Sequence, residues 1–386
     1  MNSLLQLPGK TRFGQGALEF VTETIERNVV KQVLIFTDKQ LRKLGMTEAL
    51  EAYIAKTGAR FEIVDNIVPE PSVQDVEETL AAVQNAGADL IIGVGGGSVM
   101  DTAKLVSVLL GAPYTVRDLL KDPLQARRKY RTLMIPTTCG TGSEATCNSI
   151  VVIPEEQVKK GIVNPALIPD EVILDVNFIK DLPKSIIAAT GVDALAHCVE
   201  SFTSKKATIL PDLYASSGAK LIFHNIEKAY ASGFAQRDLP SLENMLLGAY
   251  YGGVAITSSG TTAVHALSYP LGGRYHIPHG VSNAILFSDV MRFNLDACRD
   301  RLAALCDVVY PENTGKAEDE KAEFLIQEIS RIVKNTEIPV SLKEFGIKDS
   351  DLEDLVLAGS KQERLLVNNR KVLSLDDIRA IYRRLI

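Results

Sequence analysis

The sequence predicts a protein of two domains, an α/β nucleotide-binding domain with a mostly parallel sheet followed by an all-helical domain. With 386 residues, the chain is longer than the size at which a single hydrophobic core keeps growing. Its first half alternates short β-branched runs with helical patterns, which indicates parallel strands joined by crossover helices. From about Pro183 onward, long helical patterns dominate. We therefore expect one domain over residues 1–182 and a second over residues 183–386.

Each expected element is a run whose apolar spacing fits one type of secondary structure. The candidate strands are Gln32–Thr37, Phe61–Val64, Asp89–Val94, Thr132–Pro136 and Val172–Asp175. The segments Val73–Ala86 and Asp101–Leu110 repeat apolar residues at helical spacing and are expected to be crossover helices. In the second half, helices are expected over Lys184–Thr203, Asp212–Ser232, Ser241–Ile256, Lys321–Lys334 and Leu375–Leu385.

The composition argues against several classes of function. Hydrophobic residues make up 46% of the chain, but no apolar run reaches the roughly 20 residues that a membrane helix needs. The net charge of −6, without a basic cluster that has interleaved aromatic residues, argues against a nucleic-acid partner. The N-terminus lacks the pattern of a secretory signal, so we expect a cytosolic protein. Five cysteines without CxxC spacing indicate reduced, packed thiols: Cys139, Cys147, Cys198, Cys298 and Cys306.

A glycine-rich loop follows the third candidate strand in the segment DLIIGVGGGSVMDTAK. Gly96, Gly97 and Ser98 stand between that strand and the next helix, where backbone N–H groups and the positive helix end can bind a diphosphate. The pattern departs from GxGxxG, because Ser98 stands where a third glycine is expected. A glycine-rich turn that binds no ligand therefore stays an alternative.

Two further features fit a dinucleotide. The loop PTTCGTGSE follows the next strand and carries the hydroxyl groups of Thr137 and Thr138, so both loops can contact one ligand at the carboxyl edge of the sheet. Asp38 follows the first strand, where a carboxylate can accept hydrogen bonds from a ribose diol and repel the 2′-phosphate of NADP. The alternative is that Asp38 only caps the following helix.

Four residues of the second half form a candidate metal site. Asp193 and His197 lie four residues apart in GVDALAHCVE, so both project from one face of a helix. Such a pair is commonly a salt bridge, but His265 and His279 add two further imidazoles within the same part of the chain. One carboxylate and three imidazoles suit Fe²⁺ or Zn²⁺, either of which can polarise a substrate oxygen as a Lewis acid.

Together these motifs resemble those of the iron-containing, or group III metal-dependent, alcohol dehydrogenase family. The matching segments run over nearly the whole chain: GGGSVMDTAK, PTTCGTGSE, ATGVDALAHCVE, HALSYPLGG and IPHGVSNA. The resemblance implies this family's two-domain fold, which is similar to that of dehydroquinate synthases. It also implies NAD(H)-linked reduction of an aldehyde to a primary alcohol, with one Fe²⁺ or Zn²⁺ per subunit, in a homo-oligomer of two or more copies.

The resemblance also implies roles for individual residues. By position they are Asp193, His197, His265 and His279 as metal ligands, Gly96, Gly97 and Ser98 as the diphosphate loop, Thr137, Thr138, Asn148 and Lys159 as cofactor contacts, and Asp38 as the ribose-binding acid. One departure concerns proton transfer. Many members have a second histidine four residues after the third ligand, and here that position holds Tyr269. The proton could then pass through Tyr269, His276 or water, and His276 could instead be a hydrogen-bonded structural histidine.

The substrate is expected to be a short aldehyde with an anion at its far end. The segments PTTCGTGSE, AVHALSYP and RLLVNN are most similar to those of the family's 4-hydroxybutyrate dehydrogenases, which implies succinic semialdehyde as the aldehyde. Arg364 of RLLVNN is the candidate guanidinium for the distal anion, the alternative being a solvent-exposed arginine. Sulfoacetaldehyde, lactaldehyde or propanediol, and other short alcohols are the alternative substrates.

Other classes of protein fit the sequence less well. A polyol dehydrogenase or an NAD-using cyclising lyase remains a rival within catalysis, although the single-metal dehydrogenase motifs argue against the lyase. A catalytically silent scaffold that assembles through its helical half would be expected to have broken metal or phosphate motifs, and here those motifs are intact.

Overall fold

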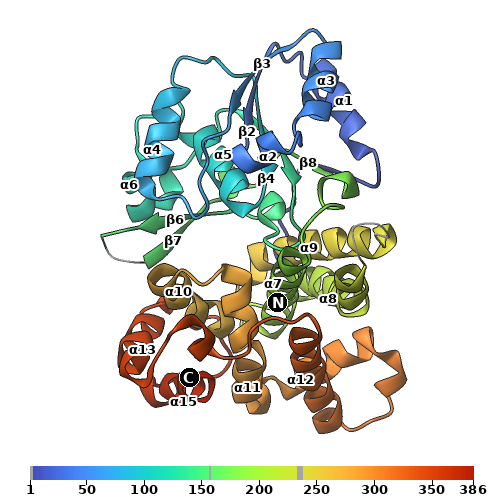
Figure 1. Ribbon diagram of the computed structural model, residues 1–386, viewed down its shortest axis with the longest axis vertical. Helices are drawn as coiled ribbons and strands as arrows, with labels where there is room; N and C mark the ends of the chain where they lie inside the picture. The colour runs from blue at the N-terminus through green and yellow to red at the C-terminus, as the bar shows by residue number, and fades with distance from the viewer. Residues whose placement is uncertain (1–2, 156–157, 233–237) are drawn as a thin grey trace. The chain divides into compact units, whose positions relative to one another are not determined.

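The computed structural model describes residues 3–155, 158–232 and 238–386 (Figure 1). The chain divides into two compact units. The first, called the sheet unit here, comprises Gln6–Thr138 and Gly142–Asp181. The second, called the helical unit, comprises Met1–Leu5, Cys139–Thr141 and Leu182–Ile386. The predicted fold class, a parallel-sheet α/β domain followed by a helical domain, is confirmed.

The centre of the sheet unit is a six-stranded sheet in which every paired strand runs parallel. Its order is β1 (Lys10–Phe13), β8 (Glu171–Leu174), β5 (Arg131–Pro136), β4 (Leu90–Gly95), β2 (Gln32–Phe36) and β3 (Arg60–Val64). Five of these strands correspond to the predicted runs. The prediction missed β1, because its residues KTRF form a short edge strand with no apolar pattern. Since β2, β4 and β5 are parallel neighbours, the residues that follow them gather along one edge of the sheet.

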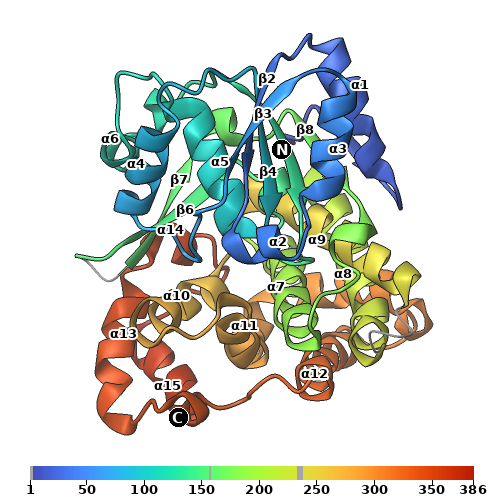
Figure 2. The same ribbon diagram turned by 45° about the horizontal axis from the view of Figure 1, so that its top comes forward.

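Helices cover both faces of this sheet, because side chains of a strand point alternately to its two sides. Val33 and Ile35 of β2 share a hydrophobic cluster with residues of α1 (Phe20–Arg27) and α3 (Glu48–Lys56). Leu34 and Phe36 share a different cluster with residues of α5. Figure 2 shows α1 and α3 on one side of the sheet and α4 and α5 on the other. Both faces of the sheet are therefore buried, which explains why the strands are continuous apolar runs in the sequence.

The described part of the sheet unit has four further α-helices, and two predicted boundaries need correction. They are α2 (Lys39–Lys43), α4 (Val73–Ala82), α5 (Gly97–Leu109) and α6 (Val116–Lys121). Helix α4 ends four residues earlier than predicted. Helix α5 begins at Gly97 rather than Asp101, so the last glycine of the GGG run already belongs to the helix.

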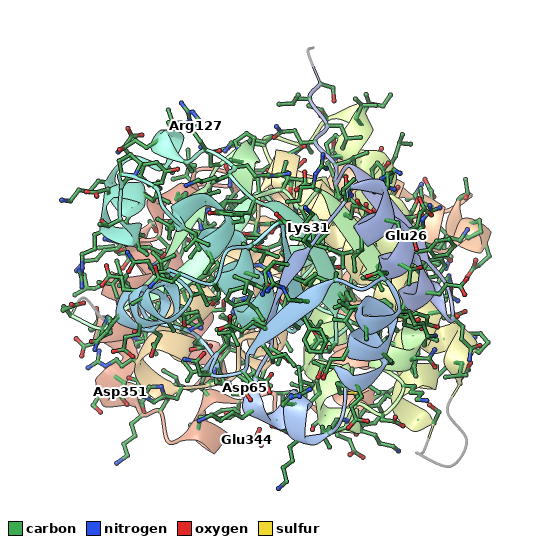
Figure 3. The ribbon with its side chains drawn as sticks, turned by 90° about the horizontal axis from the view of Figure 1, so that it is seen from above. Glu26, Lys31, Asp65, Arg127, Glu344 and Asp351 are labelled. Atoms are coloured by element: carbon green, nitrogen blue, oxygen red, sulfur yellow. The ribbon has the colours of Figure 1, made fainter. Side chains whose placement is uncertain are left out.

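Charges of both signs lie on the surface of the sheet unit, among them Glu26, Lys31 and Arg127 in Figure 3.

A two-stranded hairpin was missed by the sequence analysis. Strand β6 (Asn148–Ile153) pairs antiparallel with β7 (Val158–Val163), and Lys159 stands opposite Val152. Burial alternates along β6, as expected for a strand with one covered face. The mixed run VKKGIV of β7 gave no clear strand pattern because polar residues interrupt it.

The helical unit contains only helices and turns in its described part. They are α7 (Lys184–Thr203), α8 (Ile209–Ala231), α9 (Leu239–Ser259), α10 (Ala263–Tyr275), α11 (His279–Val309), α12 (Glu318–Asn335), α13 (Leu352–Ser360), α14 (Glu363–Leu366) and α15 (Leu375–Leu385). The predicted bounds of α7 and α15 are confirmed. Helices α9 and α12 extend beyond the predicted segments at both ends, whereas α8 begins and ends earlier than predicted. None of the helices in the described ranges is long and apolar enough to span a membrane.

Close packing of α7, α8 and α9 depends on small residues. A Cβ atom at Gly218 of α8 would lie 2.8 Å from Cys198 Sγ of α7 and 3.0 Å from the carbonyl oxygen of Gly248 in α9. Both distances are shorter than normal contacts, so a larger residue would force these helices apart. All five cysteines are buried and none of them forms a disulfide bond, which confirms the prediction of packed thiols.

Candidate metal and cofactor sites

The four predicted metal ligands come together within the helical unit. Asp193 and His197 project from α7, His265 lies in the first turn of α10, and His279 is the first residue of α11. Oδ1 of Asp193 lies 3.9 Å from His197 Nε2, 3.5 Å from His265 Nε2 and 3.7 Å from His279 Nε2. Three imidazole nitrogens from three helices therefore point at one carboxylate oxygen.

The turn between α10 and α11 explains how two histidines fourteen positions apart reach one site. His276 ends α10 with a left-handed backbone, at φ 54°, and Pro278 precedes the first residue of α11. The chain thus reverses within three residues, which sets His279 near His265; their ring centroids are 5.3 Å apart. The rings of His197 and His265 stack at 4.7 Å.

The donor set fits a divalent metal ion. Ligands bound at about 2.1 Å lie roughly 3.4 Å apart in a tetrahedral site, which is close to the separations from Asp193 Oδ1. The candidate ligand atoms of Asp193, His197 and His265 all lie within 4.8 Å of one another, and these residues are buried. The side chain of His279 is 30% exposed, so the site is more open on that side. An open side is what a catalytic rather than a structural metal needs.

The charges in the site favour an ionised Asp193. Burial alone would raise the pKa of its carboxyl group, but His197, His279 and His265 together lower that pKa well below its usual value. Burial lowers the pKa of His197. For His265, burial is outweighed by Glu200 and Asp193, which raise its pKa to about 9. A cation at these nitrogens would therefore have a carboxylate partner.

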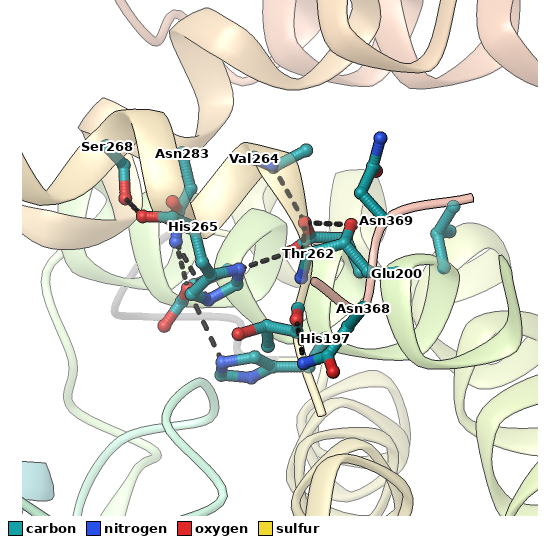
Figure 4. A network of polar contacts seen from close by, with 12 residues as sticks. His197, Glu200, Thr262, Val264, His265, Ser268, Asn283, Asn368 and Asn369 are labelled. Atoms are coloured by element: carbon teal, nitrogen blue, oxygen red, sulfur yellow. Dashed lines mark hydrogen bonds and ion pairs between the residues drawn. The ribbon is translucent and has the colours of Figure 1, made fainter. Parts of the chain in front are cut away.

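Glu200 is a functional candidate that the sequence analysis missed. Its carboxylate is 0% exposed and accepts hydrogen bonds from the backbone and hydroxyl of Thr262, from Val264 N–H, and from Nδ1 of His265 (Figure 4). Burial alone would raise the pKa of Glu200, but the His265 ring and these donors lower it. A signal was present in the sequence, because Glu200 follows Asp193 by seven residues and therefore lies on the same helix face.

Asn283 is a second residue that was missed. Its Nδ2 donates to Asp193 Oδ1 at 2.7 Å and lies 3.2 Å from His265 Nε2 and 3.3 Å from His279 Nε2. It follows His279 by four residues on α11, the spacing that also joins Asp193 to His197 on α7. Its Oδ1 is buried without a hydrogen-bond partner among the described residues. The amide thus lies among the candidate ligand atoms.

The two proton-relay candidates lie in different environments. Tyr269 is 8% exposed, and its ring centroid lies 5.8 Å from that of His279. His276 is exposed at the C-terminus of α10. Of the two, Tyr269 is the one in contact with a candidate ligand.

Arg364 is exposed in α14, but its neighbours connect this helix to the site. Leu365 belongs to one hydrophobic cluster with Tyr269 and Ala266 of α10. Asn368 donates from Nδ2 to the Thr261 carbonyl at 3.0 Å, immediately before the residue that binds Glu200. These contacts fix the position of α14 beside Tyr269.

Within the sheet unit, the predicted cofactor residues follow three adjacent strands. Asp38 comes two residues after β2, Gly96, Gly97 and Ser98 follow β4, and Thr137 and Thr138 follow β5. Because these strands are parallel, all of these residues lie along one edge of the sheet. This edge is the position where open α/β sheets bind nucleotides.

The diphosphate loop has features that suit an anion. Gly96 precedes α5 without a side-chain cap, so the first N–H groups of that helix can turn to a phosphate. A Cβ atom at Gly96 would lie 3.7 Å from the Thr138 side chain, which brings the two loops together. The Thr138 hydroxyl oxygen is buried and has no hydrogen-bond partner within the described residues. A bound dinucleotide could satisfy this orphaned hydroxyl.

Asp38 does cap the following helix. Its Oδ1 accepts a hydrogen bond of 2.9 Å from Leu41 N–H at the start of α2. This contact does not exclude the ribose-binding role, because a carboxylate has a second oxygen that can accept from a ribose hydroxyl.

Asn148 and Lys159 lie on the β6–β7 hairpin. Lys159 is largely buried and forms an ion pair of 2.5 Å with Glu70, whose N–H donates to Ser98 Oγ at 3.0 Å. Lys159 is thereby linked to the diphosphate loop through one residue. Glu70 has a left-handed backbone, at φ 53°, a strained conformation for a residue other than glycine.

Two buried charged residues of α5 bind the loop PTTCGTGSE, which follows β5. Lys104 donates to the Ser143 carbonyl at 3.0 Å and to Thr146 Oγ1 at 3.1 Å, and it pairs with Asp101 at 2.9 Å. Asp101 in turn accepts from Ser143 Oγ and from Ile150 N–H. The two loops are thus held by a single helix.

Comparison with known proteins identifies the class. Residues 8–176 match the family described as Iron-containing alcohol dehydrogenase, and residues 187–386 match the Fe-containing alcohol dehydrogenase family, C-terminal. The chain belongs to the iron-containing alcohol dehydrogenase family and is an NAD-dependent alcohol dehydrogenase. This family uses NAD(H) and a divalent metal ion, so both predicted cofactors are confirmed.

Individual relatives cover almost all of the chain. It is 35% identical to Long-chain-alcohol dehydrogenase 1 of Geobacillus thermodenitrificans, over 97% of this chain and 94% of the relative. It is 31% identical to lactaldehyde reductase of Escherichia coli, over 96% of each. Among solved structures, a 1,3-propanediol oxidoreductase superposes with a TM-score of 0.94 at 29% identity, with both chains fully covered. The relatives thus differ in the alcohol or aldehyde for which they are named.

Proposed function

We propose that this enzyme reduces a short aldehyde with a distal anion, with succinic semialdehyde as the physiological substrate and 4-hydroxybutyrate as the product. The main support for metal-dependent catalysis is that His197, His265 and His279 all face one oxygen of Asp193. The substrate part is supported by Arg364, whose helix packs beside Tyr269 through Leu365.

The proposed chemistry divides between the cofactors and the chain. A divalent metal at Asp193, His197, His265 and His279 supplies a Lewis acid for the carbonyl oxygen, and NADH supplies the hydride. Asp193 offsets the positive charge in a buried site. Tyr269 is placed beside His279 to donate its hydroxyl proton to the alcohol oxygen as the product forms.

Cofactor binding is proposed at the carboxyl edge of the sheet. Gly96, Gly97 and Ser98 hold the diphosphate through backbone N–H groups at the start of α5. Thr137, Thr138, Asn148 and Lys159 are proposed to contact the rest of the dinucleotide, and Asp38 its adenosine ribose. Sulfoacetaldehyde is the second candidate substrate, since a sulfonate suits a guanidinium as well as a carboxylate does.

A screen of NADH oxidation tests the substrate class. The purified enzyme would be assayed by absorbance at 340 nm with succinic semialdehyde, sulfoacetaldehyde, lactaldehyde and propanal. We expect kcat/KM for one of the two anionic aldehydes to exceed that for propanal by at least about tenfold. Higher kcat/KM for the neutral aldehydes would contradict the proposed anion site and favour a lactaldehyde or propanediol type of enzyme.

Cofactor preference should depend on Asp38. We expect Asp38→Gly to narrow the preference for NAD over NADP at least tenfold, or about 1.4 kcal/mol, because a negative charge near the 2′-phosphate is removed. Glycine is tolerated as a helix N-cap, so α2 should persist. Asp38→Asn is the matched control for capping, because it keeps the acceptor for Leu41 N–H and removes only the charge. An unchanged ratio of kcat/KM values in both variants would refute this role.

We also propose that the enzyme is cytosolic and that it assembles into a homodimer or a larger homo-oligomer. Size-exclusion chromatography with light scattering would measure the second directly.

A further inference from the structure

Both carboxylate oxygens of Glu200 accept hydrogen bonds beside the candidate metal ligands, and the proposed chemistry leaves this residue without a role. It lies on α7, one turn beyond His197, and none of its surface is exposed. We propose that Glu200 is a positioning residue whose two oxygens perform separate tasks, one capping α10 and the other fixing the ring of His265 so that Nε2 faces the metal. This proposal rests on the metal role of His265 proposed above.

The first oxygen, Oε1, serves the fold. It accepts from Thr262 N–H at 3.0 Å, from the Thr262 hydroxyl at 2.6 Å and from Val264 N–H at 2.8 Å. Thr262 immediately precedes α10, so these are N–H groups at the start of that helix, where an anion is stabilised by the helix dipole. Glu200 therefore caps a helix that is remote in sequence.

The second oxygen, Oε2, serves the ligand. It is hydrogen-bonded to Nδ1 of His265, whose Nε2 lies 3.5 Å from Asp193 Oδ1 (Figure 4). A carboxylate can only accept at this position, so Nδ1 must carry the proton. When a metal displaces the proton of Nε2, the neutral ring keeps its Nδ1 proton and presents its lone pair at Nε2, the nitrogen that faces the other candidate ligands. Glu200 thus selects the tautomer that can bind a metal.

The same geometry predicts how a glutamine at this position would be oriented. With its amide oxygen in the place of Oε1, glutamine keeps all three hydrogen bonds to Thr262 and Val264. Its NH₂ group then replaces Oε2 and donates to Nδ1 of His265. The opposite orientation would lose three acceptor contacts to keep one, so it is disfavoured. Glu200→Gln should therefore preserve the helix cap but shift the proton of His265 to Nε2.

The test compares metal affinity in Glu200→Gln and Thr262→Val. The affinity of each full-length variant for Zn²⁺ and Co²⁺ would be measured by competition with a chelator, with NADH fluorescence titration and thermal unfolding as checks on the fold. We expect Glu200→Gln to weaken metal binding about 10- to 100-fold. Thr262→Val removes a hydroxyl bond from Oε1 only, so its affinity should stay within about threefold of the parent protein's.

The spectrum of bound Co²⁺ separates positioning from a general loss of structure. At saturating Co²⁺, Glu200→Gln should give the altered visible absorption of His265→Ala, because both lack a ligand at this position, whereas Thr262→Val should keep the parent spectrum. Equal weakening in both variants, or a parent-like affinity and spectrum in Glu200→Gln, would overturn the proposal. If the parent protein binds no stoichiometric metal, the metal role itself fails, which is a distinguishable outcome.

A measurement on the parent protein guards against a variant that does not fold. A proton on Nδ1 of a histidine that donates to a buried carboxylate resonates far downfield in the proton NMR spectrum. The metal-free parent should show one such resonance that is absent from His265→Ala. A parent spectrum without it would overturn the assignment of a proton to Nδ1 of His265.

Discussion

Replacing His279 with alanine is expected to abolish aldehyde reduction, by at least about a thousandfold in kcat, and to lower the metal bound per subunit. The reason is that His279 supplies one of the three imidazoles that face Asp193, and developing negative charge on the substrate oxygen would lose its charge partner. His279 is preferable to His265 for this test. His265→Ala would also leave Oε2 of the buried Glu200 without its hydrogen-bond donor, which destabilises the fold.

The measurement combines steady-state kinetics with elemental analysis and NADH titration. His224→Ala is the matched control, because His224 bonds to the Val309 carbonyl and is not among the candidate ligands. The control should keep its metal and its activity. NADH binding should persist in His279→Ala, since the proposed nucleotide-binding residues belong to the other unit. Full activity in a metal-free His279→Ala preparation would refute the site.

Replacing Arg364 with alanine is expected to raise KM for succinic semialdehyde or sulfoacetaldehyde by the equivalent of roughly 1.5–3 kcal/mol, the range for a hydrogen bond to a charged group. Propanal, which has no anion, should be nearly unaffected. The placement of α14 supports this difference, because Leu365 packs with Tyr269 while the neighbouring Arg364 is exposed.

Two matched variants sharpen this test. Arg364→Lys keeps a positive charge but lacks the planar pair of donors, so its effect should be intermediate. Arg383→Ala removes another exposed arginine of the same unit and should leave both classes of aldehyde unchanged. Equal losses for anionic and neutral aldehydes in Arg364→Ala would show that Arg364 is structural.

The sequence predicted most of the sheet because parallel strands that are buried on both faces are continuous apolar runs. It missed β1 and the β6–β7 hairpin, whose residues are half exposed and whose pairing depends on distant partners. The start of α5 was placed too late because glycine weakens a helical pattern even where, as at Gly97, the helix begins.

The four predicted metal ligands lie together in the structure, and their spacing in the sequence predicted part of this arrangement. Asp193 and His197 share a helix face by sequence alone, but only the structure shows which residues of α10 and α11 meet them. Glu200 and Asn283 were missed because their candidate roles depend on hydrogen bonds to residues of other helices, which the sequence does not show. Tyr269 was singled out only as a departure from a family pattern, and the structure adds its contact with His279.

The origin of the ligands on three separate helices also bears on how the enzyme unfolds. An ion that binds α7, α10 and α11 together can bind strongly only while those helices keep their native arrangement. Free metal at a hundred times its dissociation constant would then add about 2.7 kcal/mol to the free energy of unfolding. The concentration of free metal would therefore determine both the fraction of active molecules and the resistance of the protein to heat and to proteases.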